Sequence, residues 1–207
     1  MLKNKVFMEK ITDLSQLDPN GLYSYADYLT WQFEQAIELI KGKINKMAAP
    51  SRRHQGISWN FTVFVSQIFK RDTYHAYAAP FDVRLYDRRK SAKANKDIFT
   101  VVQPDLCIIC DLTKLDDKGC LGAPDFIVEI LSPGNSSKEM KTKKLLYEEN
   151  AVREYWIIDP ERETITTFHL QENGRYSPPT IYVSDETAES VIFPHFSVTL
   201  ETLFENL

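Results

Sequence analysis

The chain has 207 residues, 43% of them hydrophobic and 26% charged, which is the composition of an ordinary globular protein with one substantial core. Its formal net charge of -4 gives no overall attraction to nucleic acid, so any such binding must depend on local groups of Lys and Arg. No apolar run reaches the roughly 18 residues of a membrane span, and the start lacks a secretion signal. We therefore expect a cytoplasmic protein with no membrane partner. Three cysteines, an odd number, do not suggest a disulfide framework.

The first third of the chain predicts a short helix, a hairpin and a long helix. Ser24 and Asp27 have the spacing of a capping box, which opens a helix toward Trp31. Residues 37–44 predict a hairpin that turns near Gly42. A long helix then starts near residues 50–51, and its buried stripe is predicted to comprise Ile57, Phe61, Phe64, Val65, Ile68 and Phe69.

The remainder predicts a sheet with one more helix. Residues 81–85 alternate between apolar and polar side chains, which is typical of a half-exposed strand, while residues 101–109 and 125–131 predict buried strands. Residues 138–150 predict a helix, and residues 154–170 predict a hairpin. We expect a single domain over residues 1–207, with a helical segment (1–35), a core (36–170) and a C-terminal tail packed on the core (171–207).

Each of the two buried strands carries one carboxylate, Asp105 in the first and Glu129 in the second. An ionised carboxylate that is buried without a partner is so costly that it normally neutralises, pairs with a cation or binds a metal. In the second strand Ile127, Glu129 and Leu131 are expected to share one face, with the intervening residues on the other. Two such acids on neighbouring strands suggest a divalent cation site.

The chemistry of this acid pair favours a hard cation. With no His or Cys cluster beside it, the pair suits Mg²⁺ or Mn²⁺. Such a cation polarises a phosphoryl oxygen and lowers the pKa of a bound water, and phosphodiester hydrolysis is a reaction class that needs both effects. The helix after the second strand offers Lys143 or Lys144 to stabilise the transition state, and Tyr147 shares a helix face with Lys143. A second basic cluster, at residues 88–96, is more often a solvated loop than a binding surface.

Several motifs resemble, in order, those of the Uma-type family, described as putative restriction endonucleases of the PD-(D/E)XK nuclease superfamily. The resemblance covers most of the chain and includes residues 38–42, 50–55, 80–85, 102–105, 123–133, 143–147, 154–160 and 192–194. It implies a restriction-endonuclease-like fold of the α/β (α+β) class, with a mixed central sheet flanked by helices. It also implies a metal-dependent endonuclease that acts on DNA.

Carried over residue by residue, the resemblance implies that Asp105 is the motif aspartate and Glu129 the second acid of the metal site. The superfamily usually has a lysine two positions after that acid, where this chain has Leu131. In the Uma-type family that lysine is displaced onto the following helix, and the match falls on Lys143. Glu38 matches an acid that completes the metal shell, and a further match falls on the adjacent pair His54 and Gln55.

These assignments have simpler alternatives. Asp105 follows a proline and could cap a turn, and Glu129 could form a purely structural ion pair with Lys143. The choice between Lys143 and its neighbour Lys144 stays open at this point. His54 could equally be an ordinary core or surface histidine, and an acid such as Glu38 is common in hairpins.

We expect a homodimer, because cutting both strands of a duplex calls for two sites related by a two-fold axis. Two other classes of function also fit the sequence. One is a nucleic-acid-binding module that keeps the nuclease fold with weak catalysis or none, which the apolar Leu131 and the negative net charge allow. The other is a structural or regulatory protein-interaction domain.

Overall fold

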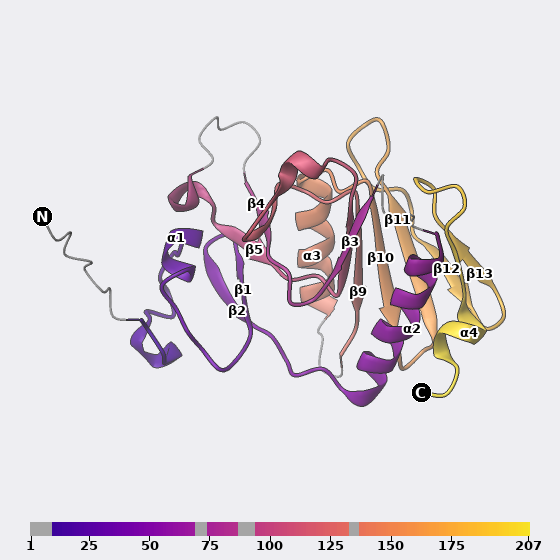
Figure 1. Cartoon of the computed structure of the whole chain (residues 1–207), viewed down its shortest axis with the longest axis horizontal. Coiled ribbons are helices and arrows are strands. Elements are labelled where there is room, and N and C mark those ends of the chain that lie inside the picture. The colour runs from indigo at the N-terminus through magenta and orange to yellow at the C-terminus, as the bar shows by residue number, and fades with distance from the viewer. Residues whose placement is uncertain (1–9, 69–73, 87–93, 133–136) are drawn as a thin grey trace, which may run out of the picture. The chain divides into compact units, whose positions relative to one another are not determined.

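The computed structural model describes residues 10–68, 74–86, 94–132 and 137–207, drawn in colour in Figure 1. Predictions for Phe69, for most of the basic cluster at residues 88–96 and for the sheet break at residues 133–136 fall partly or wholly outside these ranges. The chain divides into two compact units, one formed by Met1–Ala49 with Arg84–Val102 and the other by Pro50–Val83 with Gln103–Leu207. The expectation of one domain stays a prediction.

The first unit contains the predicted capped helix and hairpin. Helix α1 (Tyr25–Tyr28) has Ser24 as its N-cap, and the backbone N–H of Ser24 donates to the Asp27 carboxylate at 2.8 Å, so the capping box is confirmed. The helix ends at Tyr28, one turn earlier than expected. Strands β1 (Ile37–Ile40) and β2 (Lys43–Lys46) pair antiparallel, and the turn between them has positive φ angles at Lys41 and Gly42. Strand β5 (Thr100–Val102) pairs antiparallel with β1, and two short 3-10 helices, η1 (Leu14–Gln16) and η2 (Asn95–Asp97), also belong to this unit.

Strand β4 (Val83–Leu85) differs from the half-exposed strand predicted for residues 81–85, because all three of its residues are buried. Arg84 is only 2% exposed, and its guanidinium carbon lies 5.4 Å from the centre of the Tyr25 ring. A cation over an aromatic face is attracted by the ring's quadrupole, which lets an arginine occupy a buried position. Alternation in the sequence could not reveal that partner.

The second unit is built on a six-stranded mixed sheet with the strand order β12-β11-β10-β9-β6-β3. Strands β9 and β10 are parallel, and the other adjacent pairs are antiparallel. Because a parallel pair needs a crossover, helix α3 (Ser137–Glu149) connects β9 to β10. The strands of this sheet are β3 (His75–Ala78), β6 (Leu106–Ile109), β9 (Phe126–Ile130), β10 (Glu154–Asp159), β11 (Thr164–His169) and β12 (Thr180–Val183).

Two helices cover opposite faces of this sheet, as Figure 1 shows. Adjacent residues of a strand point to opposite faces, and on β10 the Trp156 ring contacts Phe61 of helix α2 (Arg52–Ile68) at 6.1 Å between centroids. The neighbouring Tyr155 ring contacts Tyr147 of α3 at 5.0 Å. The α2 face holds the main hydrophobic core. The remaining elements of the unit are η3 (Leu112–Lys114), β7 (Leu115–Asp116), β8 (Gly119–Leu121), β13 (Thr187–Glu189), β14 (Ser197–Thr199) and α4 (Leu200–Phe204).

The run of residues 101–109 is not one continuous strand, as the sequence had suggested. β5 ends at Val102 and β6 begins at Leu106, so Asp105 lies just before a strand rather than inside one. Pro104 has no N–H to donate to a ladder, and the Gln103 amide donates to the Asp82 carboxylate at 2.8 Å. The break sets Asp105 at the end of the sheet. Among the described residues, the helices are too short or too polar to cross a bilayer.

Candidate active site

Asp105 and Glu129 approach each other at one end of the β6–β9 pair. The antiparallel register pairs Leu106, the first residue of β6, with Val128, so Asp105 just precedes this pair on one chain segment and Glu129 just follows it on the other. The charges of both carboxylates act on the pKa of His54, so both acids lie near its ring. The alternate residues Phe126, Val128 and Ile130 all lie in the core beneath α2. Glu129 therefore projects from the opposite face, the one that α3 covers, as alternation predicted.

Glu129 is held by two side chains of α3. The Lys143 ammonium donates to Oε1 of Glu129 at 2.9 Å, and the Tyr147 hydroxyl donates to the same oxygen at 2.5 Å. The carboxylate and ammonium side chains are each 11% exposed. Lys143 and Tyr147 are four residues apart, so they lie one above the other on the helix face that contacts β9. The structure thus brings together the acid, the lysine and the tyrosine that the sequence singled out.

Asp105 is fixed by one backbone and one side-chain group. Its Oδ2 accepts the Ile130 N–H at 2.7 Å, which ties it to the end of β9, and its Oδ1 lies 3.2 Å from Nε2 of His54. His54 occupies the first turn of α2, where Ser51 caps its backbone N–H at 3.1 Å. Helix α2 therefore contributes to Asp105, just as α3 contributes to Glu129.

Opposing effects act on the pKa of His54. Burial of the ring lowers the pKa, but the hydrogen bond and charge of Asp105, a hydrogen bond to the Ile130 carbonyl and the charge of Glu129 together raise it above the usual value. The acid pair thus favours the imidazolium form of His54. That form donates its Nε2–H toward Asp105 and partly balances the negative charge of the site.

The remaining candidate residues have other surroundings. Lys144 points away from the acid pair, with its ammonium 4.7 Å from the centre of the Phe168 ring. Gln55 is exposed on α2. Glu38 belongs to the first unit, where it is buried on β1 and accepts a hydrogen bond from the Asn45 amide at 3.1 Å. Leu131, at the position where the superfamily usually has its lysine, is partly buried and apolar.

The donor set of the acid pair fits Mg²⁺ or Mn²⁺ better than zinc. Within the described ranges, no group of three or more His, Cys, Asp or Glu residues is arranged to hold a metal ion. Zinc usually takes three or four protein ligands, whereas Mg²⁺ keeps several waters and needs only one or two carboxylates. Asp105 and Glu129 would be those carboxylates.

One supporting contact went unrecognised in the sequence. The hydrogen bond from Gln103 to Asp82 fixes the turn just before Asp105, and the Ala79 N–H donates to the Asp105 carbonyl at 3.2 Å. Gln103 stands two residues before the acid, in the Val-Gln-Pro-Asp motif, and a polar residue between buried valines and a proline was the available signal. Its partner, 21 residues earlier, carried no signal of its own.

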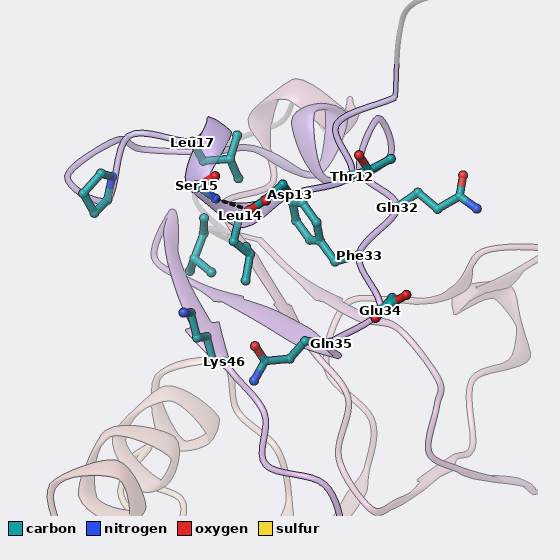
Figure 2. A pocket seen from close by; sticks show the side chains of 12 residues that line it. Thr12, Asp13, Leu14, Ser15, Leu17, Gln32, Phe33, Glu34, Gln35 and Lys46 are labelled. Carbon is teal, nitrogen blue, oxygen red and sulfur yellow. Dashed lines mark hydrogen bonds between the residues drawn. The ribbon is translucent and has the colours of Figure 1, made fainter.

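A pocket of about 1150 Å³ in the first unit is a separate feature (Figure 2). Its polar groups are used locally: the Asp13 carboxylate accepts the Ser15 N–H at 2.8 Å, and the Gln35 amide donates to the Met47 carbonyl at 3.2 Å. Asp13 and Glu34 line it together with a single lysine, Lys46. This lining does not provide the paired acids and ammonium found in the second unit.

The fold has a counterpart among solved structures. The structure is similar to a crystal structure described as a putative nuclease belonging to DUF820 from Anabaena variabilis, with a TM-score of 0.68 and 19% sequence identity over 88% of this chain and 97% of that one. At this identity the likeness shows the fold alone, which is the mixed nuclease-like fold expected from the sequence. No curated protein matches the chain.

The family follows from a second comparison. Residues 25–201 match the model of the Uma2 family, whose description is "Putative restriction endonuclease". The chain belongs to this family, as its motifs predicted. The match supports a nuclease.

Proposed function

We propose that this protein is a metal-dependent endonuclease that hydrolyses phosphodiester bonds in DNA. The observation that carries the proposal is the meeting of Asp105 and Glu129 at one end of the β6–β9 pair, with the Lys143 ammonium 2.9 Å from Glu129. Family membership supports the hydrolytic activity. The metal and the DNA substrate are inferred from the chemistry of the donor set.

In this proposal Asp105 and Glu129 bind Mg²⁺ or Mn²⁺, which, when bound, polarises a phosphoryl oxygen and lowers the pKa of a water. Lys143 orients the attacking water or stabilises the extra negative charge of the pentacovalent phosphate. The water gives up a proton to solvent as its oxygen bonds to phosphorus. The bond from phosphorus to the leaving oxygen breaks, and that oxygen takes up a proton from solvent. The metal ligands and the stabilising cation all lie at the acid pair.

The surrounding residues receive supporting roles. His54 holds Asp105 through Oδ1, and Tyr147 holds Glu129 through Oε1, so each acid has a fixed orientation beside Lys143. Lys144 receives no catalytic role, because its ammonium lies over Phe168. Glu38 lies in the first unit, and its part in completing the metal shell, directly or through water, stays a prediction.

A homodimer is part of the proposal, because a double-strand break needs two active sites on opposite strands. Sedimentation equilibrium with and without duplex DNA measures this directly. A monomer under both conditions would restrict the enzyme to cutting one strand at a time.

The central test compares Asp105→Ala, Glu129→Ala and Lys143→Met with the matched control Lys144→Met. Lys144 is the adjacent lysine of the same helix, so its replacement removes the same charge without touching the acid pair. We expect the first three variants to lose cleavage of plasmid and linear DNA in Mg²⁺ or Mn²⁺, while Lys144→Met keeps it. Circular dichroism and thermal melting establish that each variant is folded.

The outcomes separate the possible classes of function. Cleavage by the parent protein that persists in Asp105→Ala would overturn the site assignment. DNA binding without cleavage in either metal would instead indicate the nuclease-fold binding module. If the protein neither binds nor cleaves DNA, the results would favour a protein-interaction domain.

A further inference from the structure

A side-chain hydrogen bond joins two points of the second unit between which the chain belongs to the first. The chain passes into the first unit after Val83 and returns to the second at Gln103. Asp82 lies just before the first of these points, and its Oδ1 accepts a hydrogen bond from the Gln103 amide at 2.8 Å. Both side chains are partly buried. The bond therefore ties the end of one segment of the second unit to the start of the next, two residues before Asp105.

Asp82 belongs to a segment that is itself held in place. The backbone N–H of Cys120 on β8 donates to the Asp82 carbonyl at 2.9 Å. Gly119, with a φ of +116°, approaches so closely that a Cβ there would lie 2.2 Å from the same carbonyl oxygen. The Phe81 ring stacks on Tyr77 of β3, with 4.1 Å between the ring centroids. The Asp82 carboxylate is thus attached to a firmly packed backbone.

The link from Gln103 to Asp105 is stiff. Pro104 lies between them and is buried, and a proline ring fixes φ at about −65°. The residue before a proline is itself restricted to extended conformations. Few backbone rotations therefore remain to absorb a displacement of Gln103 before it reaches Asp105.

The backbone of Asp105 is supported differently on its two sides. On the C-terminal side it continues directly into β6, which is paired with both β3 and β9. On the N-terminal side the preceding strand, β5, belongs to another sheet, so the Gln103 bond takes the place of a ladder within the second unit. Mg²⁺ demands near-ideal geometry with oxygens at about 2.0–2.1 Å, so a carboxylate that binds it tolerates little displacement.

We propose that Gln103 and Asp82 are positioning residues of the metal site, whose hydrogen bond sets the backbone at Asp105 and thereby the place of its carboxylate in the acid pair. Neither residue touches the substrate in this assignment. Replacing a group that orients a metal ligand typically weakens metal binding by about 10- to 100-fold. The inference rests on the proposed function, because it requires that Asp105 bind the metal.

Reversing the polarity of the bond tests the pair. Gln103→Glu places a second carboxylate against that of Asp82, so the hydrogen bond is lost and the two groups repel each other. Adding Asp82→Asn supplies an amide that donates to the new carboxylate, so the double variant regains the bond with donor and acceptor exchanged. The double variant also keeps the net charge of the parent. Asp82→Asn alone keeps an acceptor for the Gln103 amide and should have a smaller effect.

Mn²⁺ alone probes the site without DNA. The electron paramagnetic resonance signal of free Mn²⁺ measures how much of the ion the full chain binds. We expect the parent to bind Mn²⁺ at a site that Asp105→Ala removes. Gln103→Glu should weaken this binding by about 10- to 100-fold, and the double variant should recover the affinity of the parent. Circular dichroism and thermal melting establish that each variant is folded.

The sign of the change separates positioning from a simple effect of charge. Gln103→Glu adds a negative charge two residues from Asp105, and Coulomb attraction alone would tighten the binding of a cation. Gln171→Glu is the matched control, because it adds the same charge to an exposed residue between β11 and β12. This residue follows the end of β11 that pairs with Glu154, whereas Glu129 is paired with Ile157. Its Mn²⁺ affinity should equal that of the parent.

Each outcome supports or overturns the inference. If folded Gln103→Glu binds Mn²⁺ as tightly as the parent, or if adding Asp82→Asn does not restore its affinity, the pair has only a structural role and the nuclease proposal stands. If Gln103→Glu does not fold, Gln103→Ala removes the bond without repulsion and should weaken Mn²⁺ binding by about 10-fold. If the parent binds no Mn²⁺, or Asp105→Ala binds it equally well, the proposed function fails and the inference with it.

Discussion

Two buried glutamates lie on the neighbouring parallel strands β9 and β10, and their surroundings differ in kind. Glu129 receives hydrogen bonds from two side chains, Lys143 and Tyr147, both on α3. Glu154 is 1% exposed and receives the Trp156 indole N–H at 2.7 Å and the Ser190 hydroxyl at 2.8 Å, together with two backbone N–H groups of residues 191–192.

The difference separates a structural acid from a candidate catalytic one. Backbone amides cannot leave their partner without unfolding the segment that carries them, so Glu154 fastens the C-terminal residues to β10. The partners of Glu129 are the ends of two side chains, and Asp105 lies nearby, just before the first paired residue of β6. A buried carboxylate is therefore not by itself a sign of chemistry, and the nature of its donors is the more useful observation.

The largest expected effect comes from replacing the Glu129–Lys143 pair as a whole with Glu129→Gln/Lys143→Met. Removing both charges avoids leaving one of them buried and unpaired, so the free energy of unfolding should change by less than about 2 kcal/mol. The rate of DNA cleavage should fall by about 10³-fold or more, because both a metal ligand and a stabilising cation are lost. Single-turnover cleavage and urea unfolding measure the two quantities. If the double variant is less stable but cleaves DNA at the parent rate, Glu129 has a structural role like that of Glu154.

Glu154→Gln should produce the opposite pattern. The new amide places a donor where the carboxylate accepted hydrogen bonds, so buried donors lose their partner and the free energy of unfolding should fall by about 3 kcal/mol. Urea unfolding followed by tryptophan fluorescence checks this, since Trp156 is itself one of the donors. The folded fraction should keep its cleavage rate. A rate that falls further than the folded fraction would place Glu154 in the chemistry.

Tyr147→Phe tests how much one of the two donors to Glu129 contributes, because it removes the hydroxyl and keeps the ring. The ring still packs on Tyr155, so the expected loss in the free energy of unfolding is about 1.5 kcal/mol, the value of one hydrogen bond to a charged group. The Mg²⁺ concentration needed for half-maximal cleavage should also shift, because Glu129 is less firmly oriented. A metal dependence identical to that of the parent would limit Tyr147 to a structural role.

The smallest effect concerns Glu148, a third glutamate, next to Tyr147 on α3. The backbone N–H of Tyr176 and then the Arg175 guanidinium hold the pKa of Glu148 below its usual value of 4.5. A lowered pKa in the folded state stabilises the protein above the unfolded pKa, and this contribution is lost as the pH falls through the folded value. Glu148→Gln should therefore flatten the decline of the melting temperature on the acid side of pH 4.5. An unchanged acid decline would show that Glu148 contributes nothing to it.

Local patterns in the sequence predicted much of the fold. The capping box at Ser24, the turn at Gly42 and the amphipathic stripe of α2 depend on residues a few positions apart. The structure confirms the first two, and it confirms the stripe for Ile57, Phe61 and Val65, with Phe64 packed against them. Alternation also assigned the two faces of β9. The family expected from the motifs is confirmed by the match over residues 25–201.

The features that the sequence did not reveal depend on distant partners. Burial of Arg84 requires the Tyr25 ring, and the break before β6 involves the contact between Gln103 and Asp82. Glu154 attracted no notice because most of its donors come from residues 190–192. Within the site, helical periodicity placed Lys143 and Tyr147 on one face of the predicted helix. It could not show whether Lys143 or Lys144 contacts Glu129, because that depends on how α3 packs against β9. The catalytic roles themselves stay predictions.

Because Lys143 lies on a helix, the site should lose its activity when that helix unfolds locally. A lysine two residues after the acid on one strand would be tied to it by the backbone of the sheet, whereas Lys143 meets Glu129 only while α3 stays docked. Segments that open below the global unfolding free energy do so as cooperative units, and a peripheral helix opens more readily than central strands. Cleavage should therefore disappear at denaturant concentrations that leave amide protons of β9 and β10 protected from exchange, with those of α3 already exchanging.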